Sequence, residues 1–187
     1  MHAASHTKDH CRGAQYLSPV KNVCAHFNAF HVYASDPTRW VETNHYCGHL
    51  TEDVRQCLLY DSPNPGARLL GVEYMISPNL YSALDKEERQ LCHSHVFEPS
   101  PLVPQAAWEK AETAEMEEVI HLYGKILLVK PELMTSITAF DQIPDLEQVM
   151  GQRDIRFPGA DWRRKKEIQA HIEEPEIHPD AGMAWKK

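Results

Sequence analysis

Polar and hydrophobic residues follow a regular pattern between Trp40 and Ile76, where β-branched and aromatic side chains are frequent. The pattern predicts three strands, over residues 40–50, 54–60 and 68–76. Two short segments between them, 51–53 and 62–66, have the composition of turns, and the second contains Pro63, Pro65 and Gly66. Strands joined by such short turns predict an antiparallel meander.

Two other stretches have the spacing of helices. Ser18-Pro19 has the form of a helix start, and apolar residues at intervals of three and four predict a helix over 19–34. His31 lies on its apolar face, where we expect a hydrogen-bonded core residue. Residues 105–123, rich in Ala, Glu and Lys, predict a second helix that Gly124 ends. The remaining expected elements are a helix start at Ser77-Pro78, a helix over 145–150, and strands over 93–98 and 125–130.

These elements predict an α+β fold in a single domain, with an antiparallel β-meander sheet flanked by helices. A chain of 187 residues is long enough for one core of ordinary size. We expect the domain, with its metal site, to span residues 18–155. Residues 1–17 show no periodicity and are expected to form a mobile N-terminal arm. Residues 156–187 are charged and are expected to wrap the domain or to be partly disordered.

The overall composition excludes several classes of partner. Hydrophobic residues make up 42% and charged residues 25%, which is typical of a soluble globular protein. The net charge of −8 disfavours nucleic acid and anionic membrane surfaces as partners. No apolar stretch approaches the roughly 20 residues of a transmembrane segment, and no secretory signal is visible. We therefore expect a cytoplasmic protein without a transmembrane segment or a nucleic-acid partner; the sequence leaves association into a homo-oligomer open.

The cysteines do not form a recognisable motif. There are five, and no two have the spacing of a zinc ribbon or of a dithiol redox motif. In a cytoplasmic protein we expect all of them to be reduced and most of them to be buried as small hydrophobic residues. They are Cys11, Cys24, Cys47, Cys57 and Cys92.

Two pairs of histidines are spaced for metal binding in this chain of twelve histidines. His45 and His49 share a face in either a helix or a strand, and His93 and His95 share a face in a strand. Glu98 follows the second pair. These donors suit a divalent transition metal, zinc or iron first and copper as an alternative. The sequence predicts that His45, His49, His93, His95 and Glu98 bind one such ion.

Three charged residues are candidates for a catalytic role. Glu73 lies among apolar residues of a predicted strand, where a carboxylate is costly to bury unless a cation or a hydrogen-bond donor meets it. Arg55 and Lys125 are candidates for binding a substrate or supporting the metal ligands. Solvated surface charge is the alternative interpretation of Arg55 and Lys125.

The run from Cys24 to Glu98 resembles the plant oil body-associated proteins. The matching strings are CAHFNAFHVYASDPTRWVETNHYCGHLTEDVRQCLLYDSPNPGARLLGVEYMIS and then HSHVFE, with shorter matches at 123–125 and 177–179. The wider family, of unknown biochemical function, also occurs in fungi and bacteria. The resemblance implies association with lipid storage droplets and supplies no catalytic residues. Asn44 stands where many plant members have a second His beside the one that matches His45.

Two functions are compatible with these observations. The leading hypothesis is a mononuclear metal-dependent enzyme, a lyase, isomerase, hydrolase or oxygenase, acting on a small apolar substrate at an open coordination position. The alternative is a non-catalytic lipid-droplet-associated or interaction protein with a structural metal site. Since the chain has no long apolar hairpin and no strongly basic amphipathic helix, contact with a droplet would be peripheral.

Overall fold

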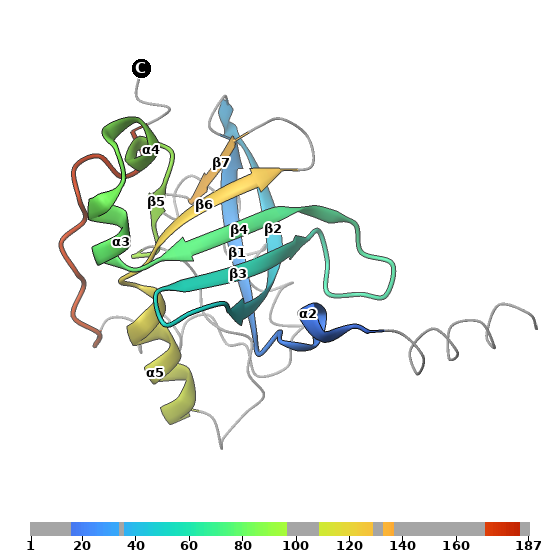
Figure 1. The fold of residues 1–187 in the computed structure, drawn as a ribbon. Coiled ribbons are helices and arrows are strands. Elements are labelled where there is room, and N and C mark those ends of the chain that lie inside the picture. The colour runs from blue at the N-terminus through green and yellow to red at the C-terminus, as the bar shows by residue number, and fades with distance from the viewer. Residues whose placement is uncertain (1–15, 34–35, 97–108, 129–132, 137–170, 184–187) are drawn as a thin grey trace, which may run out of the picture.

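The computed structural model describes residues 16–33, 36–96, 109–128, 133–136 and 171–183. A seven-stranded antiparallel sheet forms its centre, with short helices around it (Figure 1), which confirms the predicted α+β class. The strands are β1 (Ala25–Tyr33), β2 (Asp36–His49), β3 (Val54–Tyr60), β4 (Leu69–Ile76), β5 (His93–Ser94), β6 (Tyr123–Leu128) and β7 (Leu133–Ser136). The helices are α2 (Ser18–Lys21), α3 (Pro78–Ala83), α4 (Lys86–Gln90) and α5 (Glu109–Val119).

The predicted meander is confirmed as β2, β3 and β4. Cys47 of β2 pairs with Cys57 of β3, and Cys57 pairs in turn with Glu73 of β4. Along β3 the burial alternates strictly, because Arg55, Cys57 and Leu59 point into the core while their neighbours are only partly covered. This alternation fixes the register, since a shift by one residue would turn every buried side chain outward.

The prediction of a helix over 19–34 is wrong. Helix α2 ends at Lys21, and β1 then runs from Ala25 to Tyr33, paired with β2 along its length. Six consecutive residues of β1 are buried, so both of its faces are covered. A strand buried on both faces carries apolar residues on either side of the chain, and some of them fall at the helical spacing of three and four.

Six of the strands close into a ring. Their order is β4-β3-β2-β1-β7-β6, and β6 also pairs with β4, while β5 lies beside one end of β6. A closed sheet leaves few unpaired edges, and alternate side chains of each strand point into the space that it encloses. Apolar residues fill much of that space; they include Phe27, Cys47, Cys57, Leu59, Met75 and Ile126, with Val119 and Leu122 packed against them from the α5 end.

Several other expectations have clear outcomes. Helix α5 covers Glu109–Val119 of the predicted 105–123, of which 105–108 lie outside the described residues, and Gly124 lies within β6 instead of ending the helix. Among the described residues of the expected strand over 93–98, only His93–Ser94 form a strand, and the described part of the expected strand over 125–130 belongs to β6. The helix expected over 145–150 lies outside the described residues. None of the helices in the described ranges is long and apolar enough to cross a membrane.

The expectation of five reduced cysteines is also wrong. Cys47 and Cys57 form a disulfide, because the register of β2 and β3 places them directly opposite each other. Cys24 and Cys92 are free thiols, the first exposed and the second buried. Burial raises the pKa of the Cys92 thiol to about 11. Cys11 lies outside the described residues.

The neighbouring leucines of β3 test this register. Leu59 is 0% exposed inside the sheet, whereas Leu58 faces outward and is half-buried. We expect Leu59→Ala to lower the free energy of unfolding by about 2–5 kcal/mol, because the deletion leaves a cavity in the core. Leu58→Ala, the matched control, should cost clearly less. Urea unfolding of both variants makes the comparison, and equal losses would contradict the assigned faces.

Candidate metal centre

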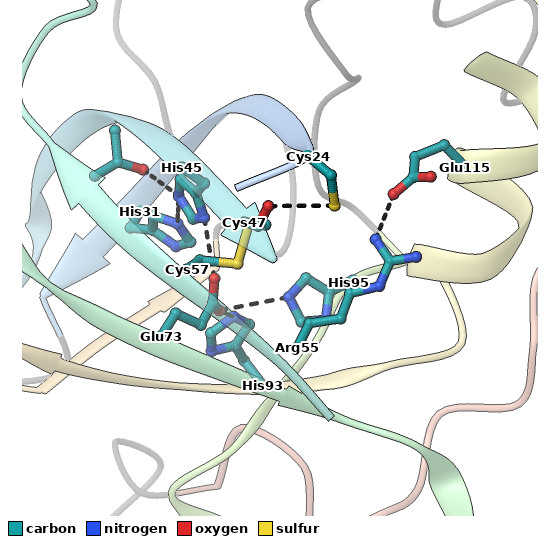
Figure 2. The surroundings of a disulfide bond; sticks show 11 residues. Cys24, His31, His45, Cys47, Arg55, Cys57, Glu73, His93, His95 and Glu115 are labelled. Carbon is teal, nitrogen blue, oxygen red and sulfur yellow. Dashed lines mark hydrogen bonds and ion pairs between the residues drawn. A yellow bond between two sulfur atoms is a disulfide. The ribbon is translucent and has the colours of Figure 1, made fainter. Parts of the chain in front are cut away.

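Four ionisable side chains meet inside the closed sheet (Figure 2). His45 comes from β2, Glu73 from β4 and His93 from β5, and His95 follows two residues after His93. Their exposed fractions are 0% for His45 and Glu73, 2% for His93 and 1% for His95. The group is therefore removed from water, and its charges must be balanced by its own members or by a bound ion.

The carboxylate of Glu73 is the centre of the group. Its Oε2 accepts a hydrogen bond from His45 Nδ1 at 3.0 Å. Its Oε1 lies 3.0 Å from His93 Nε2 and 3.4 Å from His95 Nε2. Burial alone raises the pKa of the Glu73 carboxyl, but the contacts with His45, His93 and His95 outweigh it and hold that pKa well below its usual value. Glu73 is therefore an ionised carboxylate in the interior.

The remaining nitrogen atoms fix how each ring is oriented. His95 Nδ1 donates to the backbone oxygen of Leu122 at 2.8 Å. A carbonyl oxygen only accepts, so Nδ1 carries the proton of a neutral His95 ring, and Nε2 can donate to Glu73 only when the ring carries a second proton. His45 Nε2, on the other side of its ring, lies 2.6 Å from Thr43 Oγ1 and 3.0 Å from His31 Nε2. Such contacts from outer residues orient metal ligands in proteins.

The donor atoms of Glu73, His93 and His95 all lie within 4.8 Å of one another. Ligand atoms around a tetrahedral ion with bonds of about 2.1 Å are separated by about 3.4 Å, so small shifts would bring the three into place. Two imidazoles and one carboxylate are a donor set that zinc and iron(II) accept. The chemistry of these side chains therefore fits a divalent transition metal.

Gly124 of β6 leaves the room that the group needs. A side chain beginning at this position would place its first carbon 2.6 Å from His95 Cε1 and 2.9 Å from His93 Nε2, and closer still to Glu73 Oε1. Real side chains do not approach so closely. The absence of a side chain at Gly124 lets β6 pass directly beside the three donors.

The structure brings together some of the residues that the sequence singled out. His45, His93 and His95 converge, and they do so around Glu73, which the sequence had suggested as a catalytic group. His49 is exposed at the end of β2, and no contact in the described part of the chain joins it to the other three. Glu98 lies outside the described residues. One member of the first histidine pair and both members of the second therefore lie together, and His49 lies apart from them.

Arg55 and Lys125 have other partners. The guanidinium of Arg55, a buried side chain, pairs with Glu115 and with Glu118 of α5, the latter at 2.6 Å. Lys125 Nζ lies 2.5 Å from Glu88 Oε1. Within the described residues, neither contacts Glu73. Arg55 thus anchors α5 over one end of the sheet, and the contact of Lys125 is with α4.

His31 belongs to this neighbourhood and had no role in the sequence prediction beyond that of a core residue. Its ring stacks on His45 with a centroid distance of 5.0 Å, and it also lies edge-on to His93 at 5.7 Å. Because residues 19–34 were predicted to form a helix, the sequence did not predict the contact of His31 with His45. Assigned to a strand paired with β2, His31 falls on the same inward face as Phe27 and Ala29.

Fold and site together define a small α+β protein with a closed antiparallel sheet around a buried histidine–carboxylate group. A family model described as a protein of unknown function (DUF1264) matches residues 17–173. Oil body-associated protein 1A of Zea mays is 35% identical, with 92% of this chain and 78% of that protein aligned. Oil body-associated protein 1B of Arabidopsis thaliana is 34% identical, with 92% and 77% aligned. No solved structure matches significantly.

The chain therefore belongs to the oil body-associated protein family, as the resemblance over Cys24–Glu98 indicated. The similarity extends well beyond that run, since it covers most of the chain. The family description carries no biochemical activity. Any role of the buried group must accordingly be argued from its geometry.

Gly124 offers a test of how tightly the group is packed. We expect Gly124→Ala to lower the free energy of unfolding by about 1–3 kcal/mol, because the added methyl group must displace Glu73, His93 or His95 from the crowded interior. Urea unfolding measured with and without a metal chelator makes the comparison. A variant as stable as the unaltered protein would show that the three side chains do not occupy this space.

Proposed function

We propose that this chain is a peripheral lipid-body protein whose domain is stabilised by one divalent transition metal, bound by Glu73, His93 and His95. His45 serves as a positioning residue, because its Nδ1 donates to Oε2 of Glu73, the carboxylate oxygen that does not face His93 and His95. Zinc or iron suits the donor set best, with copper as the alternative. When bound, the ion supplies positive charge and links β4 to the segment that carries β5.

One observation carries the metal proposal. His95 donates from Nδ1 to Leu122, so the lone pair of its Nε2 points at a carboxylate oxygen 3.4 Å away. Two electron-rich atoms facing each other in a dry interior need a cation between them. A proton on His95 is one such cation, and a metal ion that also meets His93 is the other.

The depth of the group favours a structural role for the ion. Each of the three donor residues is at most 2% exposed, so a substrate would have no direct path to the metal. The second candidate is the metal-dependent enzyme acting on a small apolar molecule. It is favoured by the number of ligands, because three protein ligands leave a fourth position open, as in catalytic zinc sites.

Metal content tests the proposed centre. Protein purified without an affinity tag should contain about one transition-metal ion per chain by elemental analysis. His93→Gln and Glu73→Gln should lose most of it, whereas His49→Ala, which changes an exposed histidine outside the group, should retain it. Metal at saturating concentration should raise the free energy of unfolding by about 3–4 kcal/mol over the metal-free protein.

Two results would contradict the proposal. One is the absence of stoichiometric metal from the unaltered protein, even after incubation with zinc or iron(II). The other is an equal loss of metal in His49→Ala and His93→Gln, which would place the ion elsewhere. A chelator-treated protein that unfolds at the same urea concentration as the loaded protein would reject the structural role specifically.

A groove on the outer face of the sheet is suited to contact with a lipid surface. Two adjoining cavities of about 380 Å³ each share four residues of α2, β2, β3 and the segment after α2. The shared residues are Val20, Val23, Tyr46 and Leu58. Val20 and Leu50 at this groove are 51% and 56% exposed, so apolar surface is open to solvent there. Neither cavity is lined by Asp, Glu, Lys or Arg, so the groove carries no fixed charge.

Lipid contact at this groove predicts a flotation result. The names of the relatives refer to oil bodies, and we expect this chain to float with artificial triacylglycerol droplets. Val20→Glu combined with Leu50→Glu should leave at least about tenfold more protein in the aqueous layer, because each charge would have to be buried in lipid. Leu127→Glu changes a similarly exposed leucine (49%) outside the groove and should float normally. Equal behaviour of both variants would exclude the groove.

A further inference from the structure

Three cysteines lie close together in the β1, β2 and β3 region of the sheet, beside the buried group. Cys24 directly precedes β1, and its backbone N–H donates to the oxygen of Cys47 in β2 at 2.9 Å. The Sγ atom of Cys24 lies 3.6 Å from the same oxygen, and Figure 2 shows it facing that oxygen, on the same strand segment that carries one half of the Cys47–Cys57 disulfide. A free thiol is thus held against the backbone of a disulfide-bonded cysteine.

The three sulfur atoms differ in their access to solvent. Cys24 is exposed, whereas Cys47 and Cys57 are 1% and 0% exposed. A reductant in solution can reach the first thiol but cannot approach the disulfide from outside. Disulfide exchange requires a thiolate to attack a disulfide sulfur directly, so access decides which thiol reacts. Of the two free thiols in the described part of the chain, Cys24 is the exposed one, and its backbone N–H is bonded to the backbone oxygen of Cys47.

We propose that Cys24 is the exchange thiol of the Cys47–Cys57 disulfide. Cys24 loses its proton to water, and its thiolate attacks Cys47 Sγ. The Cys24–Cys47 bond forms as the Cys47–Cys57 bond breaks, and Cys57 leaves as a thiolate that takes up a proton. One disulfide and one thiol are present before and after the step, so no outside oxidant or reductant is needed.

The exchange moves the reactive disulfide toward solvent. After it, the disulfide includes the exposed Cys24, where a dithiol reductant can attack and release both cysteines. Cys57, now a thiol, stays directly opposite Glu73 in the β3–β4 pair. The exchange therefore changes the surroundings of the buried group, but it stands whether or not that group binds a metal.

Disulfide mapping tests the proposal in a Cys11→Ser background, which removes the cysteine outside the described residues. Full-length protein is quenched with acid, alkylated, digested and analysed by mass spectrometry. We expect both Cys47–Cys57 and Cys24–Cys47 linkages. Cys24→Ser should slow the reduction of Cys47–Cys57 by dithiothreitol about tenfold or more, because the direct route is blocked by burial. Cys92→Ser, a control on the other free thiol, should be reduced at the unaltered rate.

A second variant tests the geometry independently. Cys57→Ser leaves Cys24 and Cys47 as the neighbouring pair, and oxidised glutathione should join them into a disulfide. The proposal is overturned if Cys24→Ser is reduced as fast as the unaltered protein, or if Cys92→Ser is slowed equally. It is also overturned if natively folded Cys57→Ser, as judged by circular dichroism, keeps both cysteines as thiols.

Discussion

The buried carboxylate of Glu73 is the interaction on which the arrangement of this protein depends. An ionised side chain that is 0% exposed is stable only where hydrogen-bond donors or a cation meet it, and three imidazoles surround Glu73. Those rings come from β2 and from the β5 segment, so the balance of charge requires β4 to be closed in by both. Pairing of β4 with β3 on one side and with β6 on the other achieves this closure. The closure of the sheet and the stability of the buried carboxylate therefore depend on each other.

Much of the sheet follows from local pattern, because β2, β3 and β4 alternate and are separated by strong turns. Helix α5 was likewise visible from its composition. The first strand was not, since the covered faces of β1 give a spacing that a helix also produces. Its misassignment concealed the contact between His31 and His45, and pattern alone does not show that β4 pairs with β6. Long-range closure depends on packing between segments that are distant in the sequence, and no local signal records it.

The site was likewise predictable only where it depends on local spacing in the sequence. His93 and His95 lie two residues apart, and a pair spaced for one strand face needs no knowledge of topology. Glu73 was conspicuous as a charge in an apolar strand, although its role as the centre of the group depends on the closed sheet. His49 satisfied the spacing rule and is still exposed, at the end of β2 beyond Cys47, the last residue of β2 that pairs with β1. The disulfide was missed because its two halves are defined by cross-strand register and not by their separation in sequence.

The segment over 171–183 has a consequence for the order in which the protein matures. Gly182 donates its N–H to the oxygen of Cys92 at 2.6 Å, and His178 donates to the Tyr123 hydroxyl at 3.1 Å. These bonds hold the residues that immediately precede His93 and Gly124. The ribosome makes this segment after every strand of the sheet, so the two strand ends next to the buried histidines receive these bonds only after the sheet itself has been synthesised. Until then, the ends of β5 and β6 beside the buried histidines would lack these two hydrogen bonds.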